Sequence, residues 1–439
     1  MKTINVCAPF VLALSIACFG QTEPRSVSMP EAAVTTMSVD EAVAAALEGN
    51  PEIRAEVRRL SLARMKIATA RSLDDPMLQV RDWDTPVTKP WDLNQAQLMV
   101  MLQQSFPGRE KREMRAKLAE DDASGAEAAL ESLRQQVSAE TRKLCSDLMR
   151  NADELRLEAS QKALLQEAHG VALAQYTTGK APQADVLRAQ MALTRLNEQL
   201  IELEEERDNA RAQLNAMMGR RPEDAVDIAG NYATPAPLPR IEELEQAAIA
   251  HRPELAALRT AITKSRDESK LTQLATKPDF TVGLGYMLMP TGSSSRNAYM
   301  AELSINLAQL NRARHEGEAK QADKATDVSQ SELDARASAV FLEIRQAQIA
   351  VQAAEKRVKL YRDTLLPQAE ATFKASAAAY QGNRAEFMSV IDAQNLLLEI
   401  QSDYYKASAA TDAGIAQLER AIGSPIADAT NGHAERTNQ

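Results

Sequence analysis

The chain has 439 residues, with 51 lysines and arginines against 61 aspartates and glutamates, and a formal net charge of −10. Only 4% of the residues are aromatic, and 3 are cysteines. This composition indicates long helices packed through small side chains, and it excludes an aromatic-rich β-sandwich and a disulfide scaffold. The acidic balance also argues against a nucleic-acid partner, which would need basic patches to neutralise phosphates.

The N-terminus has the pattern of an export signal. Lys2 precedes the apolar run Val6–Phe19, which is too short to span a bilayer well. We therefore expect a signal peptide over 1–20, followed by an N-terminal segment over 21–37. Lipidation of Cys18 is an alternative form of processing, although Leu14 lies one residue further from the cysteine than in a usual bacterial lipobox.

The sequence lacks motifs that carry catalytic chemistry. It has no P-loop and no glycine-rich dinucleotide turn. Its histidines are scattered and never stand at i, i+4 spacing with a carboxylate partner, so they predict no zinc site. Cys145, the one cysteine left in the mature body, is expected to be a small apolar residue on a helix face. We expect no enzyme activity, no cofactor and no metal site.

The chain contains two tandem copies of one unit. Asn50–Ile53 returns as Arg252–Leu255, and Tyr176 returns as Tyr380. Further matches follow in the same order: Pro76 with Pro278, Val186 with Val390, Gln190 with Gln394, and Gly219 with Gly423. Such an ordered series indicates a duplication. We divide the chain into copy one, a linker, copy two and a flexible tail, at 38–221, 222–240, 241–424 and 425–439.

Each copy begins with helical sequence. In copy one, Ser38 and Glu41 form a capping box, in which the serine oxygen accepts a free backbone N–H and the glutamate reaches back. Pro51 interrupts this helix, which resumes to about Ser72. An extended stretch is predicted to start at Pro76.

The extended stretches are the strand candidates. In copy two, Phe280, Val282, Leu284 and Tyr286 alternate with small or polar residues, and the run Tyr299–Leu307 alternates likewise. A period of two places the apolar residues on one face, and each run has the length of a tilted membrane strand, about ten residues. Copy one has matching runs at Met77–Trp83 and Gln95–Gln104. A hairpin on a soluble core is the alternative.

Long helices come next. Arg109–Tyr176 contains no proline and would span about 100 Å as one helix, more than a compact domain of this size needs. Copy two repeats the pattern over Ala313–Ala378, interrupted near Pro367. Each long helix ends in a short turn, Tyr176–Gly179 or Tyr380–Asn383, after which a second helix returns. Glycine and asparagine share the last position of these turns and tolerate the left-handed conformation that ends a helix.

These features resemble the TolC family of outer-membrane efflux proteins. The resemblance rests on the signal peptide, the duplicated helix–strand–strand–helix–turn–helix unit, and the Tyr-x-x-Gly turn followed by Val186-Leu187-Arg188-Ala189-Gln190. It covers about 38–424. Gln104–Arg109 is also similar to the CzcC/CusC-like branch, which serves heavy-metal exporters of the resistance-nodulation-division type.

The resemblance implies a mainly α fold with a small β part. Long helical hairpins would form a periplasmic α-barrel, and four strands per protomer would join a trimeric 12-stranded β-barrel in the outer membrane. The implied function is the outer-membrane channel of a tripartite efflux system, a passive duct for substrates such as heavy-metal cations. The implied partners are two further copies of the chain, outer-membrane lipid, a periplasmic adaptor of the membrane fusion type and an inner-membrane RND-type pump.

The resemblance also implies the functional residues. The hairpin turns would contact the adaptor through Thr177, Thr178, Gly179, Gln381, Gly382 and Asn383. Asp185 and Tyr380 match a polar network that locks the closed tip. The family's gate arginine falls on Ala385 here, and the adjacent Arg384 is its candidate replacement. Asp392 matches one carboxylate of the family's pore constriction, while Ser389 occupies the position of the other.

Two other functions stay open on the sequence alone. A type I protein-secretion duct would share the fold and differ in its inner-membrane partner. A soluble periplasmic coiled-coil scaffold or adaptor would place the strands in a small soluble domain.

Overall fold

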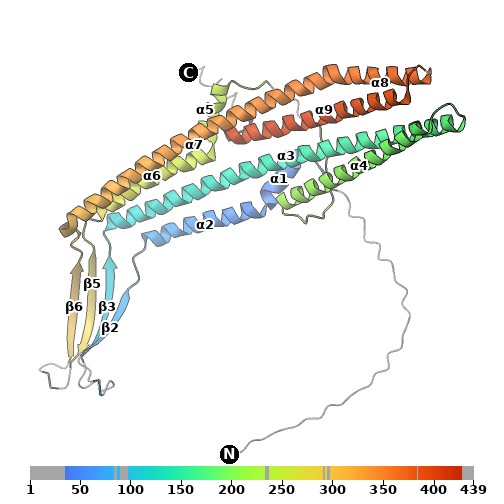
Figure 1. Ribbon diagram of the computed structural model, residues 1–439. Helices are drawn as coiled ribbons and strands as arrows, with labels where there is room; N and C mark the ends of the chain where they lie inside the picture. The colour runs from blue at the N-terminus through green and yellow to red at the C-terminus, as the bar shows by residue number, and fades with distance from the viewer. Residues whose placement is uncertain are drawn as a thin grey trace, which may run out of the picture.

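The computed structural model describes residues 35–83, 87–88, 97–232, 237–289, 292–293, 297–382 and 384–427. The predicted signal peptide, Cys18, Gln95, Asn383 and the end of the predicted tail lie outside these ranges. The protein is elongated, with a small β-sheet at one end and the tips of two helical hairpins at the other (Figure 1).

Both copies fold in the same order, which confirms the predicted mainly α architecture with a small β part. Copy one comprises α1 (Val39–Gly49), α2 (Pro51–Arg71), β2 (Met77–Trp83), β3 (Gln97–Phe106), α3 (Arg109–Thr177) and α4 (Gln183–Met217). Copy two comprises α5 (Ile241–His251), α6 (Pro253–Leu274), β5 (Phe280–Leu288), β6 (Asn297–Ile305), a 3₁₀ turn η1 (Ala308–Asn311), α7 (Arg312–Leu360), a π-helical turn η2 (Tyr361–Leu365), α8 (Leu366–Gln381) and α9 (Phe387–Ile422).

Two elements were missed by the sequence analysis. A short strand β1 (Thr35–Met37) pairs in parallel with β4 (Val226–Ile228), so the end of the N-terminal segment lies against the linker. Three-residue strands carry too little alternation to be recognised. The predicted interruption near Pro367 is a π-helical turn, after which the chain continues as α8.

The larger sheet has four antiparallel strands in the order β2–β3–β5–β6. Its register aligns the apolar residues of neighbouring strands: Leu284 lies opposite Leu102 on one side and Ala301 on the other. Phe280, Val282, Leu284 and Tyr286 are 42%, 42%, 66% and 39% exposed. The face that the alternation predicted to be apolar is therefore uncovered in the protomer.

The opposite face of the sheet is closely packed. Met99 and Met101 of β3 are each 1% exposed. A Cβ at Gly283 would lie 2.8 Å from the Met101 sulfur, so glycine there leaves the space that the methionine fills. Gln103 Nε2 on the same face donates to Glu302 Oε2 at 3.4 Å. This face combines methionine packing with polar groups.

The helices continue the order of the strands. Between the sheet and the middle of the molecule, α2 packs on α3, α3 on α6 and α6 on α7. Beyond the middle, α3 packs on α4 and on α9, and α9 packs on α8 (Figure 1). Within the described ranges, no helix has the combined length and apolarity needed to cross a membrane.

Each copy closes around its own apolar core at mid-length. In copy one this core includes Val137, Leu144 and Leu214, and in copy two it includes Val340, Ile344 and Leu418. The predicted environment of Cys145 is correct, because this residue is fully buried in the core of copy one. Burial raises the pKa of its thiol to about 12, so the group stays protonated.

The residue before the first helical proline of each copy secures the end of the returning helix. In copy one, Asn50 Oδ1 accepts from Glu52 N–H at 2.8 Å, and its Nδ2 donates to Met217 O of α4 at 3.1 Å. In copy two, Arg252 Nη1 donates to Ala421 O of α9 at 3.0 Å. The two copies therefore close the same junction with different side chains.

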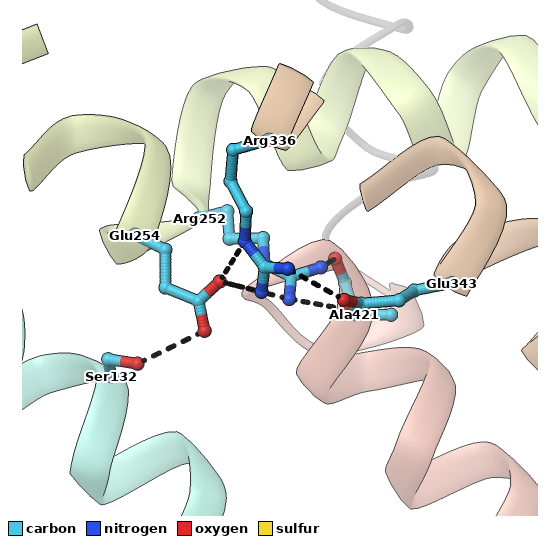
Figure 2. A network of polar contacts seen from close by, with 6 residues as sticks. All are labelled: Ser132, Arg252, Glu254, Arg336, Glu343 and Ala421. Carbon is cyan, nitrogen blue, oxygen red and sulfur yellow. Dashed lines mark hydrogen bonds and ion pairs between the residues drawn. The ribbon is translucent and has the colours of Figure 1, made fainter. Parts of the chain in front are cut away.

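The buried Arg252 is also part of an ionic network whose other members are half-buried (Figure 2). It pairs with Glu343 at 2.5 Å and with Glu254 at 3.2 Å, and Arg336 bridges the same two carboxylates. Burial works against ionisation of Glu254, but hydrogen bonds and charges from Arg336 and Arg252 outweigh it and hold the pKa of Glu254 below its usual value. The network joins α6, α7 and the end of α9.

Replacing Glu254 should weaken the protein only where the carboxylate is ionised. Because its native pKa is lowered, its ion pairs stabilise the fold above about pH 4.5, and this stabilisation is lost as pH falls through the native value. We expect Glu254→Gln to lower the thermal midpoint by about 2–4 °C at pH 7 and by a smaller amount at pH 3. Circular dichroism in detergent measures this, with the exposed Glu242→Gln as control. An equal loss at both pH values would contradict the ionic account.

Candidate gate at the hairpin tips

The same turn is built at both tips. In the first, Thr178 N–H donates to Ala174 O and Lys180 N–H donates to Gln175 O at 2.8 Å, with Gly179 at a φ of 73°. In the second, Gly382 N–H donates to Ala378 O, and Arg384 N–H donates to Ala379 O at 2.8 Å. The left-handed glycine expected in the first turn is confirmed, while Asn383 of the second lies outside the described residues.

The residues predicted to contact an adaptor lie at these tips. Thr177 and Thr178 are exposed, and each hydroxyl donates to Ala174 O, so they stiffen the turn while facing outward. Gly382 is exposed as well. Their role in adaptor contact stays a prediction.

A small apolar cluster holds the two hairpins together near the tips. It is formed by Leu165, Ala189, Leu196, Phe387 and Ile391, from α3, α4 and α9. The Tyr380 ring packs against it, with its centroid 5.5 Å from that of Phe387. The cluster places the tyrosine hydroxyl at the boundary between α8 and α3.

Tyr380 joins the two hairpins through one hydrogen bond. Its hydroxyl donates to Gln175 Oε1 of α3 at 2.8 Å. Burial and the nearby charge of Asp185 raise the pKa of Tyr380, and the bond to Gln175 acts in the opposite direction. The structure thus brings Asp185 and Tyr380 into one neighbourhood, but it gives the hydrogen bond to Gln175 and pairs Asp185 with Arg188 at 3.5 Å.

Sequence reasoning missed Gln175 as a partner. The residue occupies the last turn of α3, directly before Tyr176, where a half-buried glutamine has no distinguishing sequence pattern. The duplication relates Tyr380 to Tyr176, yet the position of copy two equivalent to Gln175 is Ala379. The pairing therefore depends on how the two hairpins lie against each other, which repeat matching does not show.

Arg384 lies back over its own turn. A Cβ at Gly382 would stand 3.2 Å from Arg384 Nε, so the guanidinium covers the glycine. Arg384 is exposed in the protomer. Whether it takes the place of the family's gate arginine stays a prediction.

Asp392 and Ser389 lie on α9 with different surroundings. Ser389 Oγ donates to Glu386 O at 2.7 Å, which ties it to the first turn of its own helix. Asp392 is exposed and borders a groove of about 620 Å³ between α4 and α9. Charged residues of both signs line this groove: Glu158, Arg188, Arg195, Asp392, Glu399, Asp403 and Lys406.

The contact surface between α3 and α9, here called the seam, is polar between the middle of the molecule and the hairpin tips. Gln394 Nε2 donates to Gln161 Oε1, and Ser402 Oγ donates to Glu154 Oε1 at 2.6 Å. Arg150 Nη1 pairs with Glu154 at 2.6 Å. Burial, followed by the charge of Glu154, raises the pKa of Glu158 one turn further along. The two hairpins thus meet through exchangeable hydrogen bonds as well as through the tip cluster.

A protein-family comparison decides the identity of this architecture. The family model described as outer membrane efflux protein matches residues 42–220 and 244–424. The chain belongs to this family. Its two matched segments correspond to the two structural copies, and membership assigns the protein to the outer membrane.

Individual proteins show how far the likeness extends. The cobalt-zinc-cadmium resistance protein CzcC of Cupriavidus metallidurans is 21% identical over 398 residues, which cover 90% of this chain and 92% of CzcC. The outer membrane protein VceC of Vibrio cholerae matches with a TM-score of 0.71 and 19% identity, covering 88% of this chain and 96% of VceC. The channel CusC matches with a TM-score of 0.74 and 14% identity, covering 89% and 93%. VceC and CusC share the fold of this chain.

Removing the tip hydrogen bond should loosen the contact between the hairpins. Tyr380→Phe keeps the ring packing and loses a bond of about 0.5–1.5 kcal/mol, so we expect the open fraction to rise about 2- to 10-fold. Single-channel recording of the purified protein in planar bilayers measures this. Tyr176→Phe, at the equivalent exposed position of copy one, is the matched control. A gain of the same size in both variants would contradict a specific role for Tyr380.

Proposed function

We propose that this protein is the passive outer-membrane duct of a tripartite efflux system. It would receive substrate from an inner-membrane pump and a periplasmic adaptor and release it outside the cell. The observation that carries the proposal is the pairing, in one long protomer, of a sheet with an uncovered apolar face and a distant pair of hairpin tips. Such a duct needs no catalytic residue and no cofactor.

The proposed assembly is a homotrimer. Among the described residues, the outer edges of β2 and β6 pair with no strand, so each protomer carries two open sheet edges. Unpaired backbone groups are not tolerated in lipid, whereas β2 of one protomer pairing with β6 of the next removes every edge. Three protomers would give 12 strands, a size known for outer-membrane barrels, which run from 8 strands upward. The adjoining helices would continue the wall as an α-barrel.

The two faces of the sheet fit this assembly. Phe280, Val282, Leu284 and Tyr286 would face lipid, where their burial is favourable. Gln103 and Glu302, on the opposite face, would line the water-filled interior. A soluble scaffold would leave the apolar face in water, and the family assignment also disfavours that alternative.

Heavy-metal cations are the substrate class that we favour. CzcC is named for cobalt-zinc-cadmium resistance and aligns along nearly the whole chain. In a trimer, Asp392 would form one ring of three carboxylates near the tips, and such a ring favours cations over anions. A type I protein-secretion duct has the same fold, and the identity of the inner-membrane partner separates the two functions.

The proposed roles of the repeats follow the boundaries predicted from the sequence. We propose repeats at 38–221 and 241–424, joined by the linker 222–240. In this arrangement the turns around Gly179 and Gly382 would meet the adaptor, and the contacts of Tyr380, Asp185 and Arg384 would hold the tip closed.

The ionic selectivity of the pore tests the proposal. The unmodified protein should form cation-preferring channels in planar bilayers, and Asp392→Asn should lower the cation conductance and shift the reversal potential in a KCl gradient toward zero. Loss of the ring charge is the physical reason. Glu242→Gln on α5, outside the tip region, should change neither value. Absence of channels from the unmodified protein, or its recovery as a soluble periplasmic monomer, would overturn the proposed function.

A further inference from the structure

The π-helical turn Tyr361–Leu365 interrupts the longest helical run of copy two. The N–H of Leu366 donates to Tyr361 O, the five-residue spacing of a π-helix. Pro367 follows directly and has no N–H to continue an α-helical ladder. A widened turn before a proline relieves the clash between its ring and the carbonyl four residues earlier. The regular α-helical hydrogen-bond ladder is therefore interrupted at this turn.

Between the sheet and this turn, equivalent residues of α3 and α7 keep a constant separation in sequence. Arg109 and Arg312 are the first residues of α3 and α7, and each forms an ion pair at 2.8 Å with the glutamate four residues later. Further along the two helices, several equivalent residues are buried in both copies. The buried pairs at this spacing are Val137 with Val340, Leu144 with Ala347, and Leu148 with Val351.

Between the turn and the hairpin tips, the separation between equivalent residues is larger by one, so copy two has gained one residue. Buried Leu165 now corresponds to buried Ala369, and Tyr176 corresponds to Tyr380. The helix C-caps agree, because Ala174 O and Ala378 O each accept the N–H of the residue that follows the last helical turn. The extra residue of copy two thus lies between Val351 and Ala369, the interval that contains the π-helical turn.

The π-helical turn absorbs this insertion without changing the face that α8 presents. One added residue in a regular α-helix would rotate everything beyond it by about 100°. Copy one shows that the fold does not need the insertion, because α3 runs 69 residues as one α-helix and has Ala163 where copy two has Pro367. The interruption is therefore a feature of copy two that packing alone does not require.

We propose that the turn Tyr361–Leu365 is a hinge that lets the α8–α9 hairpin tip swing relative to α3 and α4. α9 begins at the tip and ends at the Arg252 junction, so it can pivot as one rod. The chain of α7 and α8 passes through that level and must bend to follow. Tyr361 OH donates to Asp403 Oδ2 of α9 at 3.1 Å, which couples the turn to the pivoting helix.

The purpose of the hinge rests on the proposed duct function, whereas its existence does not. A swing at this point would separate Tyr380 from Gln175 across the polar seam between α3 and α9. The first hairpin has no equivalent turn, because α3 is α-helical throughout. The structure thus combines one continuous and one jointed hairpin.

The hinge can be removed by making copy two resemble copy one. Deleting the exposed Thr364 together with Pro367→Ala should produce a continuous α-helix that keeps Tyr380 in phase with Gln175. Thr364→Ala, which preserves the residue count, is the matched control. Circular dichroism and the oligomeric state in detergent establish that each variant is folded.

Two measurements on the full chain separate the outcomes. Spin labels at Glu167→Cys and Lys374→Cys, in a background lacking other reactive cysteines, report the distance from α3 to α8. We expect the deletion to narrow the distribution of label-to-label distances without moving the maximum that belongs to the closed state. We also expect it to abolish the rise in open fraction caused by Tyr380→Phe. An unchanged distribution would overturn the hinge even if channels form. A narrowed distribution without channels in the unmodified protein would keep the hinge and reject the duct.

Discussion

The free edges of the four-stranded sheet constrain the rest of this structure. A protomer with one uncovered apolar face and two open strand edges is incomplete on its own, since backbone groups need partners wherever water is excluded. The proposed closure by three chains fixes the position of every helix that continues a strand. It also explains why the helices follow the strand order and run far beyond the sheet, forming a wall around a lumen.

The features that we propose for gating lie where the two copies differ. The junction that Asn50 closes with one amide is closed by Arg252 within an ionic network, and the long helix that is continuous in copy one contains a π-helical turn in copy two. Copy two also supplies the tyrosine that reaches across to α3. In the proposed trimer the duplicated unit would form the wall, and the divergence of copy two would provide the proposed hinge.

Periodicity and repeat matching predicted most of the fold. The ends of α3 and the apolar face of β5 followed from the absence of proline and from strict alternation, because those signals are local. The hydrogen bond between Tyr380 and Gln175 could not be predicted in this way, since it joins residues far apart in sequence through the packing of two hairpins. The π-helical turn left a readable trace, one extra residue between matched buried positions, but only the structure shows how the helix accommodates it.

Cross-linking of the two sheet edges tests the central claim most directly. Single cysteines along β2 would each be combined with one cysteine in β6, in a background lacking other reactive cysteines, and oxidised in native outer membranes. The account predicts that at least one pair yields a closed covalent product of three chains and nothing larger, because each β2 meets the β6 of a neighbour. Recovery of single chains only for every pair, or of an open ladder of longer products, would contradict it.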